Sequence, residues 1–328
     1  MDNAIGCDVG GSFVKMGLFT REGYLLSKHT TPLPKFGEPA AMASWLSAAL
    51  LDFFDKNRSK RARLIGTGIG IPGPIKYPEG VIYDPPNLPF EGEIPFRALM
   101  EKHFSTPVYV DNDATVQTLG EARAGLGKGI KNFVYIALGT GIGGGIVTDG
   151  EIYRGTLGMA GEVGHLTIDY HGRQCLCGSK GCMETYASLN GLANSLKELS
   201  FPLPTEIQES FDKGQWSELP AILKEKIEQG ETRWQSVWDI FADALGAGMG
   251  TLINLFNPEK IIISGGLSYY SSLFLPRAIE RSKQYSFTLP AQSCEIVVSE
   301  LKENTGITGA AFMAFEQQNQ ARDNRPTG

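Results

Sequence analysis

The sequence predicts an α/β protein made of two similar lobes. Two stretches share one order of features, in which a strand, a turn of small residues and a second strand lead through a tight turn into a third strand. The first reads CDVGGSFVKMGLFTREGYLL (residues 7–26) and the second ALGTGIGGGIVTDGEIYR (residues 137–154). Segments with helical periodicity follow in each half. An ancient internal duplication explains the repeat, and we expect ligands to bind between the lobes.

The first half is expected to hold a meander of three strands, followed by helices and two further strands. Its segment Pro72–Pro95 is rich in proline and glycine, and we expect a long ordered loop that borders a site. The expected elements are strands at Ala4–Asp8, Phe13–Thr20, Tyr24–Thr30, Leu64–Ile71 and Val108–Val110, and helices at about Pro39–Phe54, Phe96–Phe104 and Ala114–Ala124.

The second half opens like the first and ends in alternating helices and strands. We expect a small lobe over residues 1–115, a large lobe over residues 116–305, and a disordered polar tail over residues 319–328. The expected elements are strands at Phe133–Leu138, Gly145–Thr148, Glu151–Arg154, Lys260–Ser264 and Glu295–Ser299, and helices at about Trp234–Phe256, Leu273–Lys283 and Ile307–Gln317.

Composition and charge indicate an ordinary globular protein. The chain has 328 residues, of which 42% are hydrophobic, enough to bury the cores of two domains. Its apolar runs stop well short of the roughly 20 residues of a membrane span, and its start lacks the features of an export signal, so we expect a cytoplasmic protein with no membrane partner. The formal net charge is −6 and the only basic cluster is Arg58–Arg63, which argues against a nucleic-acid partner.

The stretch Asp8–Ser12 predicts a phosphate-binding turn. A strand ends in a carboxylate, and Gly10 and Gly11 allow the hairpin backbone to approach an anion without interference from Cβ atoms. Asp8 could hold Mg²⁺ through water while Ser12 and the two glycine amides donate to phosphate oxygens. A plain β-turn with paired glycines is the alternative.

Two further glycine-rich turns suggest the rest of a nucleotide site. The stretch Leu138–Gly145 has too many glycines for a simple hairpin, and as the counterpart of the first turn it suits a nucleotide clamped between two lobes. The turn Ser264–Ser268 follows an apolar strand, where adenine or ribose could pack, or where the chain could simply pass into a helix. The candidate nucleotide contacts in these turns are Gly139, Thr140, Gly141, Gly265 and Gly266.

Asp113 is the candidate catalytic base. It follows a strand and opens a helix, where a short polar side chain often serves only as the N-cap. Beside a phosphate site, however, a carboxylate at this position could accept a hydroxyl proton as the hydroxyl attacks a γ-phosphate. Asn112 could then orient the acceptor.

A cluster of thiols and one imidazole predicts a structural Zn²⁺ site, because Cys₃His is a closed tetrahedral ligand set. A disulfide between the two closest cysteines would be strained, and their spacing is not that of a redox pair. His171 is the competing fourth ligand, and Cys7 and Cys294 are expected to be buried packing residues. The favoured ligands are His165, Cys175, Cys177 and Cys182.

Two carboxylates flank this cluster. Glu162 lies just before His165, and Glu184 lies just after Cys182, so a bound metal would hold both rigidly. Carboxylates that accept bidentate hydrogen bonds from vicinal hydroxyls are usual in sugar sites. Solvated surface positions are the alternative for both.

Taken together, these motifs resemble the ROK family of repressors and sugar kinases, whose kinases have the actin/hexokinase (ribonuclease H-like) fold with a cleft between the lobes. The zinc loop, residues 164–184, matches the family signature G-H-(x)₉-C-x-C-G-x-x-G-C-x-E with its spacing intact. The resemblance spans nearly the whole chain. Asp8–Ser12 is similar to the family's first phosphate motif, Leu138–Gly145 to the second, Ser264–Ser268 to the adenosine motif and Pro86–Pro89 to the sugar loop.

The resemblance implies an ATP-dependent and Mg²⁺-dependent kinase that phosphorylates a hexose at its 6-hydroxyl, with glucose as the leading substrate. It also implies that the C-terminal helix, residues 306–318, completes the small lobe, that the lobes close on sugar, and that the chain forms a homodimer or a dimer of dimers. Asp113 would be the base, and His165 would bind zinc through one ring nitrogen and face the sugar with the other. The implied sugar contacts are Asn87, Asn112, Asp113, Glu162, His165 and Glu184.

Departures from the family pattern leave the choice of sugar open. Ser12 replaces the more usual Thr, Asp111 the more usual Glu, and Phe90 the Trp of many glucose enzymes. Kinases for N-acetylmannosamine, N-acetylglucosamine, fructose, mannose or allose share the motifs. A non-catalytic sugar-sensing regulator is a further alternative, although only seven residues precede Asp8 and we expect no DNA-reading domain there.

Overall fold

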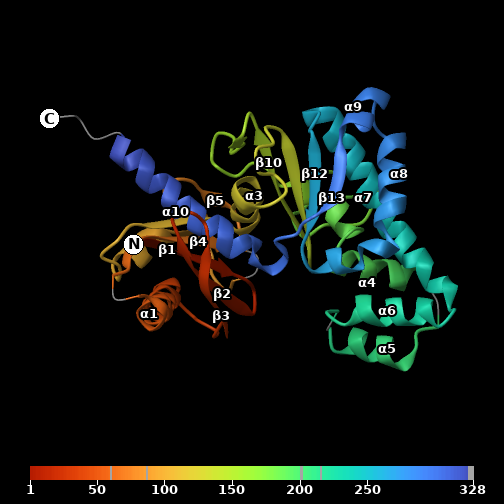
Figure 1. Cartoon of the computed structure of the whole chain (residues 1–328). Helices are drawn as coiled ribbons and strands as arrows, with labels where there is room; N and C mark the ends of the chain where they lie inside the picture. The colour runs from red at the N-terminus through yellow and green to blue at the C-terminus, as the bar shows by residue number, and fades with distance from the viewer. Residues whose placement is uncertain (60, 86–87, 200–201, 215, 324–328) are drawn as a thin grey trace. The chain divides into compact units, whose positions relative to one another are not determined.

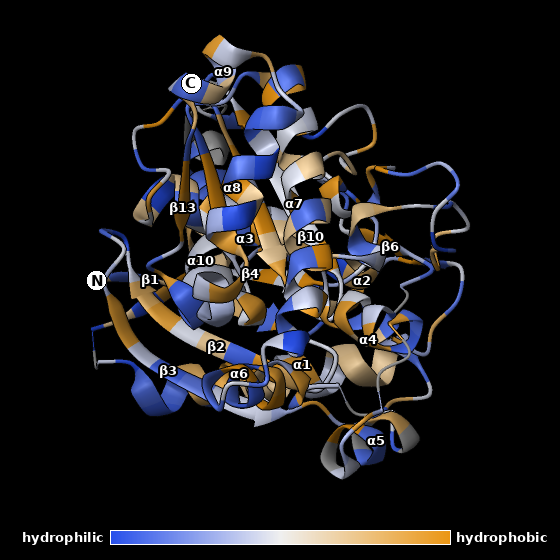
Figure 2. Cartoon of the chain, turned by 90° about the vertical axis from the view of Figure 1, so that its right-hand side faces the viewer, coloured by the Kyte–Doolittle hydropathy of each residue, from blue (hydrophilic) through white to orange (hydrophobic). Residues whose placement is uncertain are grey.

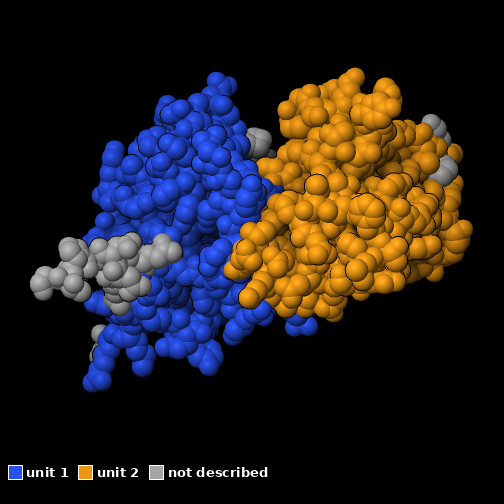
Figure 3. Space-filling model, turned by 90° about the horizontal axis from the view of Figure 1, so that it is seen from above, with its two compact units in different colours: residues 1–129, 150–161, 300–328 blue, residues 130–149, 162–299 orange. Residues whose placement is uncertain are grey.

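The computed structural model describes residues 1–59, 61–85, 88–199, 202–214 and 216–323 (Figure 1). The chain forms two compact units, coloured separately in Figure 3. Unit 1 comprises residues 1–129, 150–161 and 300–328, and unit 2 comprises residues 130–149 and 162–299. The sequence placed the first boundary at residue 115, inside a helix. In the structure this helix stays whole in unit 1, because it packs against the C-terminal helix.

Unit 1 is built on a five-stranded sheet in the order β3-β2-β1-β4-β8. The first three strands form the expected antiparallel meander, and β4 and β8 then add in parallel to β1. The parallel pairing places Asp8, Gly70 and Asp111 side by side at one edge. The strands are β1 (Asp2–Val9), β2 (Phe13–Thr20), β3 (Leu25–Pro32), β4 (Arg63–Ile71) and β8 (Val108–Asn112).

Helices pack against this sheet in two separate apolar clusters. Helix α1 (Pro39–Asn57) and the short α2 (Phe96–Glu101) bury one cluster with β1, β2 and β4. Helices α3 (Asp113–Ala124) and α10 (Thr305–Asp323) bury the other. Helix α10 lies directly on the strands, since a Cβ atom added to Gly68 of β4 would stand 1.8 Å from the Ala310 carbonyl oxygen.

The expected long loop at Pro72–Pro95 is wrong in part, because it holds a small three-stranded sheet. Strands β5 (Ile75–Lys76), β6 (Val81–Tyr83) and β7 (Glu93–Ile94) pair in that order, and each contributes one buried isoleucine. Strands of two or three residues are too short to show periodicity in a sequence. Residues 86 and 87 of the expected sugar loop lie outside the described residues.

Unit 2 repeats the strand plan of unit 1, which confirms the prediction of two similar lobes. Its strands lie in the order β10-β9-β12-β13, with β10 antiparallel to β9 and the other pairs parallel. The strand expected to begin at Gly145 begins at Ile142, because Gly143, Gly144 and Gly145 pair with β9. The strands are β9 (Phe133–Leu138), β10 (Ile142–Thr148), β12 (Lys260–Ser264) and β13 (Glu295–Val298), and β11 (Glu151–Ile152) follows within unit 1.

The core of unit 2 centres on α7 (Gln235–Phe256), whose Trp238 and Phe241 are fully buried against Phe274. In Figure 2 the strands of unit 2 around β10 and β13 are coloured mainly as hydrophobic, whereas the surface helix α8 is mainly hydrophilic. Of the smaller helices of unit 2, the sequence predicted only α8 (Leu275–Gln284). The others are α4 (Leu189–Glu198), α5 (Thr205–Asp212), α6 (Leu219–Glu228) and α9 (Thr288–Ser293).

The end of the chain differs from the expected disordered tail. Helix α10 continues through Asp323, and Arg21 donates a hydrogen bond of 2.7 Å to Asn319 at the start of the expected tail. Residues 324–328 lie outside the described part of the chain. Among the described residues, no helix combines the length and the apolar composition that a membrane crossing requires.

Candidate functional site

The first group of site residues lies in unit 1, at the carboxyl ends of β1, β4 and β8. Ligands of open α/β sheets bind at this edge of parallel strands. Asp8 lies there beside Gly70, and Asp113 follows β8 on the far side of Gly70. Burial, and then the charge of Asp113, raise the pKa of Asp8 to about 7, while Lys15 opposes the rise. The structure therefore brings the two predicted carboxylates into one electrostatic environment.

Asp113 is not the N-cap of α3. That position belongs to Asn112, whose Oδ1 accepts a hydrogen bond from the Thr115 amide at 3.1 Å. Asn112 Nδ2 donates to the Gly73 carbonyl oxygen at 3.1 Å, so the amide group has a partner at each end. Asp113 is the first residue of the helix, and its Oδ1 accepts from the Ala114 amide at 2.8 Å. Burial raises the pKa of Asp113 above its usual value.

The turn between β1 and β2 is only partly arranged for an anion. The Gly10 amide donates to the Phe13 carbonyl oxygen at 2.9 Å, and this bond closes the hairpin. By contrast, Gly11 and Ser12 are exposed, and a Cβ atom added to Gly11 would meet no other atom within 4 Å. The open side of the turn therefore consists of Gly11 and Ser12, and Gly10 shapes it.

In unit 2, the second and third glycine turns lie next to each other. Gly265 has a φ of +84°, and a Cβ atom there would stand 2.3 Å from the Leu138 carbonyl oxygen, just before the β9–β10 turn. That turn is fastened to the start of α4, since the Leu189 amide donates to Gly139 at 2.9 Å. Its Gly139 amide donates to Gly141 at 2.9 Å. Gly266 and the residues after it form the short helix η4 (Gly266–Leu273).

Glu184 links the β9–β10 turn to the cysteine loop. It lies on the one-turn helix η2 (Met183–Thr185), directly after Cys182, and its Oε2 accepts a hydrogen bond from the Ile142 amide at 2.8 Å. A Cβ atom on Gly141 would stand 2.1 Å from the same oxygen, so a larger residue there would displace the Glu184 carboxylate. Glu184 is thus hydrogen-bonded and packed against the turn, and it is not a freely solvated surface residue.

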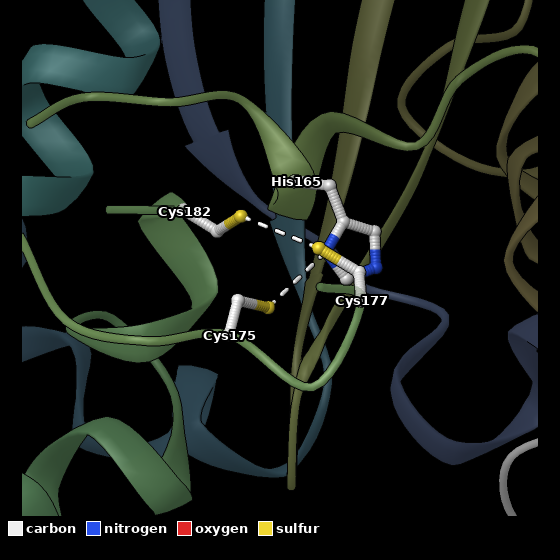
Figure 4. A group of neighbouring side chains, drawn as sticks. All are labelled: His165, Cys175, Cys177 and Cys182. Carbon is white, nitrogen blue, oxygen red and sulfur yellow. Dashed lines mark hydrogen bonds between the residues drawn. The ribbon is translucent and has the colours of Figure 1, made fainter. Parts of the chain in front are cut away.

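The four predicted metal ligands converge in unit 2 (Figure 4). Their ligand atoms all lie within 4.8 Å of one another. The Cys175 Sγ atom lies 3.7 Å from His165 Nδ1, and the Cys177 and Cys182 Sγ atoms are 3.7 Å apart. With Zn–S bonds of about 2.3 Å and Zn–N bonds of about 2.0–2.1 Å, a regular tetrahedron has edges of about 3.5–3.8 Å. The chemistry of this donor set and the two separations of 3.7 Å therefore suit Zn²⁺.

The thiols of this cluster have divergent pKa values. Burial, followed by hydrogen bonds with Cys177 and Cys175, raises the pKa of Cys182 to about 12, whereas a hydrogen bond from the Ser179 backbone lowers the pKa of Cys177. Three thiolates so close together repel one another unless a cation neutralises them. The competing His171 is exposed, packs against Tyr170 with the two rings tilted by 48°, and is outside the cluster.

Arg173 is a structural residue of this loop that sequence reasoning missed. Its guanidinium group stacks on Tyr186, pairs with Glu198 at 2.5 Å and donates to the Thr185 carbonyl oxygen at 2.7 Å. Its side chain is only 10% exposed, so these contacts fix the loop on α4. Arginine is seldom buried without partners, but the sequence does not show which partners it has.

The other predicted residues have simpler placements. Glu162 precedes the one-turn helix η1 (Val163–His165), and its carbonyl oxygen accepts from the His165 amide at 3.1 Å. Cys7 is fully buried as expected, but Cys294 is only half-buried because it lies between α9 and β13. Asn87 lies outside the described residues.

Comparisons with known proteins agree with this arrangement. The model described as "ROK family" matches residues 4–317. A glucokinase from Halalkalibacterium halodurans is 35% identical over 96% of this chain and 96% of its own length. A xylose repressor from Caldicellulosiruptor bescii is 31% identical over 95% of this chain and 77% of its own length.

A solved structure shows the same fold. The ROK family glucokinase from Streptomyces griseus, in complex with glucose and AMPPNP, is 27% identical and matches with a TM-score of 0.76 over 96% of this chain and 99% of that protein. The chain therefore belongs to the ROK family and has its actin/hexokinase-type α/β fold.

Proposed function

We propose that this protein is an ATP-dependent hexose kinase that phosphorylates the 6-hydroxyl group, with glucose as the leading substrate. Support comes from the 35% identical glucokinase and from the related structure that holds glucose and AMPPNP. The observation that carries the proposal is Asp113, a half-buried carboxylate at the carboxyl edge of the unit 1 sheet beside the phosphate-type turn. A carboxylate in this position suits proton abstraction from an attacking alcohol.

In this proposal Asp113 accepts the proton of the sugar hydroxyl. We assign the proton to Oδ2, because Oδ1 already accepts a hydrogen bond from the Ala114 amide. Burial raises the pKa of Asp113 above its usual value, which makes the carboxylate a stronger base. Asn112 anchors the turn through its two backbone hydrogen bonds, so the base starts from a fixed position.

The nucleotide contacts are divided between the glycine turns. Gly11 and Ser12, on the open side of the first turn, would donate to phosphate oxygens, and Gly10 would shape that turn. Bound Mg²⁺ would neutralise phosphate charge, and Asp8 would hold it through water. The proposed contacts in unit 2 are Gly139, Thr140, Gly141, Gly265 and Gly266.

The Cys₃His cluster is proposed to hold structural Zn²⁺. His165 would bind through Nδ1, the ring nitrogen that faces Cys175, which leaves Nε2 to meet a sugar hydroxyl. The metal would fix the loop that ends in Glu184, and Glu162 and Glu184 would accept hydrogen bonds from neighbouring sugar hydroxyls. Asn87 is proposed as a further sugar contact from the family resemblance alone.

An ADP-release assay over a panel of hexoses and N-acetylhexosamines tests the proposal. We expect glucose to give the highest kcat/KM. The Asp113→Asn variant should lose turnover by roughly two to four orders of magnitude while it still binds sugar. The control is Asp52→Asn, because Asp52 is an exposed residue of α1 that pairs with Lys56 on the surface of the same helix. Turnover by Asp113→Asn at the wild-type rate would refute the role of Asp113.

The second candidate is a sugar-responsive regulator without kinase activity, which the 31% identical xylose repressor favours. The same assay separates the two, because a regulator would bind a sugar by calorimetry and release no ADP with any member of the panel. If the protein phosphorylates another hexose faster than glucose, the proposal of a hexose kinase stands and only its leading substrate changes. A homodimer or dimer of dimers in the cytoplasm completes the proposal, and light scattering would measure the oligomeric state.

A further inference from the structure

A cavity of about 290 Å³ lies within unit 1 and is lined by two arginines with different partners. Arg123 of α3 pairs with Glu316 of α10, and both groups belong to helices. Arg154, from the segment Gly150–Gly161, pairs with Asp111 of β8. The two arginine side chains are exposed to a similar extent, 25% and 23%. They differ in what they hold, and only Arg154 reaches the strand that leads to Asp113.

The pair formed by Arg154 and Asp111 is buried on the carboxylate side. Arg154 Nη1 donates to Asp111 Oδ2 at 2.5 Å, and the Asp111 side chain is only 1% exposed. Removing one partner of such a pair leaves a charge in a site that solvent does not reach. Asp111 therefore depends on Arg154 to stay ionised in its native position.

The position of Arg154 is fixed by its own surroundings. Its guanidinium group lies 3.7 Å from the centre of the Tyr77 ring, and its carbonyl oxygen accepts from the Ala160 amide at 3.1 Å, which closes a small loop. Gly158 of that loop has a φ of +83°, and a Cβ atom there would stand 2.8 Å from the Tyr77 nitrogen. The Tyr77 hydroxyl accepts from Gln317 of α10 at 2.6 Å. Arg154 is thus held by strand β8 and by its own loop, and Tyr77, on which it lies, is tied to α10.

Asp111 passes this restraint on to the proposed base. Its Oδ2 meets Arg154, and its Oδ1 accepts a hydrogen bond from the Asn112 amide at 2.9 Å. Asn112 caps α3, and Asp113 is the next residue. One buried carboxylate thus joins Arg154 to the backbone turn that carries Asp113.

We propose that Arg154 is a positioning residue for phosphoryl transfer, which fixes Asp111 and through it the turn Asn112–Asp113. The inference rests on the proposed function. The Arg154→Met variant keeps the apolar stem that covers Tyr77 and loses the charge. We expect kcat to fall on the order of 10- to 100-fold, because a displacement of about 1 Å at a reacting group has this effect, while KM for ATP stays within about twofold of wild type.

The matched control is Arg123→Met. It removes an arginine of similar exposure from the same cavity, and this arginine pairs with Glu316 and not with Asp111. We expect this variant to lower the temperature of unfolding and to keep the wild-type kcat. Equal losses of kcat in both variants would show that the two arginines affect turnover only by stabilising the protein around the cavity. That result would overturn the proposal.

A double variant tests whether Arg154 acts through Asp111. In Asp111→Asn/Arg154→Met no lone buried charge remains, so this protein folds even where Arg154→Met alone does not. If the two residues act as one unit, the kcat of the double variant equals that of the more affected single variant and is far below wild type. The proposal would be overturned if the loss of kcat in the double variant equalled the product of the two single losses, or if the double variant had the wild-type kcat.

The Arg154→Lys variant completes the series, because it keeps the charge without the planar group that lies on Tyr77. We expect its kcat to lie between those of wild type and Arg154→Met, and a value no better than that of Arg154→Met would count against the charge. A wild-type protein that phosphorylates no sugar would overturn the proposed function and this inference together. Active wild type with unimpaired Arg154→Met would overturn this inference alone.

Discussion

Replacing Asp8 by Asn should stabilise the ligand-free protein at neutral pH, although Asp8 belongs to the proposed nucleotide site. The pKa of Asp8 rises from its ordinary value of 3.8 to about 7, first because of burial and second because of the charge of Asp113. At about 1.4 kcal/mol for each tenfold change in the acid dissociation constant, this rise corresponds to about 4 kcal/mol. The charge of the ionised carboxylate therefore destabilises the native state, and Asn removes this charge while it keeps the shape of the side chain.

This value is an upper limit for two reasons. Asp8 is only half-buried, so solvent screens part of the interaction. In addition, Asp8 Oδ2 lies at the start of α10, where a Cβ atom on Gly306 would stand 2.4 Å away from it. The amino-terminal end of a helix favours the ionised form of a nearby acid, typically by about 0.3–1 kcal/mol. We expect the measurable effect to be about 2–4 kcal/mol.

The pH dependence gives the sign. Between pH 3.8 and about 7 the folded state keeps the Asp8 proton while the unfolded chain has lost it. The free energy of unfolding of wild type therefore falls as pH rises through this window. The stability that the protonated Asp8 contributes is fully present only below its ordinary pKa of 3.8. Asp8→Asn lacks this component. Its advantage over wild type should grow by about 2–4 kcal/mol from pH 4 to pH 8.

Urea unfolding of wild type and Asp8→Asn at pH 4, 6 and 8, followed by circular dichroism, measures this difference. The control is Asp55→Asn, since Asp55 is an exposed residue of α1 whose loss should shift stability by about 0.5 kcal/mol or less at every pH. A difference between Asp8→Asn and wild type that stays constant from pH 4 to pH 8 would refute the electrostatic reasoning.

Two further predictions concern unit 2. Elemental analysis should find about one zinc per wild-type chain. The Cys182→Ala variant should lose the metal, whereas Cys294→Ala should keep it, because Cys294 lies outside the cluster. Wild-type protein without zinc would disprove the assignment. The Gly141→Ala variant should displace Glu184 and raise KM for sugar by roughly tenfold. The Gly139→Ala variant should leave this KM unchanged, because a Cβ atom at Gly139 meets nothing closer than 3.9 Å. Equal effects of the two variants on KM would contradict the contact between Gly141 and Glu184.

Sequence periodicity predicted the elements whose pattern is strong. The strands of the two five-stranded sheets and the long helix α7 carry continuous or alternating apolar residues, and the repeated turn indicated two lobes with the same strand plan. The Cys₃His group was equally accessible, because all four of its residues lie in one short loop with fixed spacing. These features depend on contacts between residues that are close in sequence or on periodic patterns, which a single sequence displays.

The details that sequence reasoning missed share a different cause. Asn112, not Asp113, caps α3, because the choice between neighbouring polar residues depends on backbone angles that both can adopt. The Gly10 amide faces into its hairpin, and hydrogen-bond direction has no sequence signature.

Long-range polar contacts are the hardest to foresee. Arg154 meets Asp111 across 43 positions of sequence, and Arg173 meets Glu198 across 25. Nothing in the pattern around either arginine names its partner, because a charged side chain can pair with any acid that the fold brings near. Both arginines nevertheless hold the segments that carry the site, one beside Asp113 and the other in the cysteine loop. The motif residues supply the proposed chemistry, and their exact positions depend on such contacts, which only the folded chain creates.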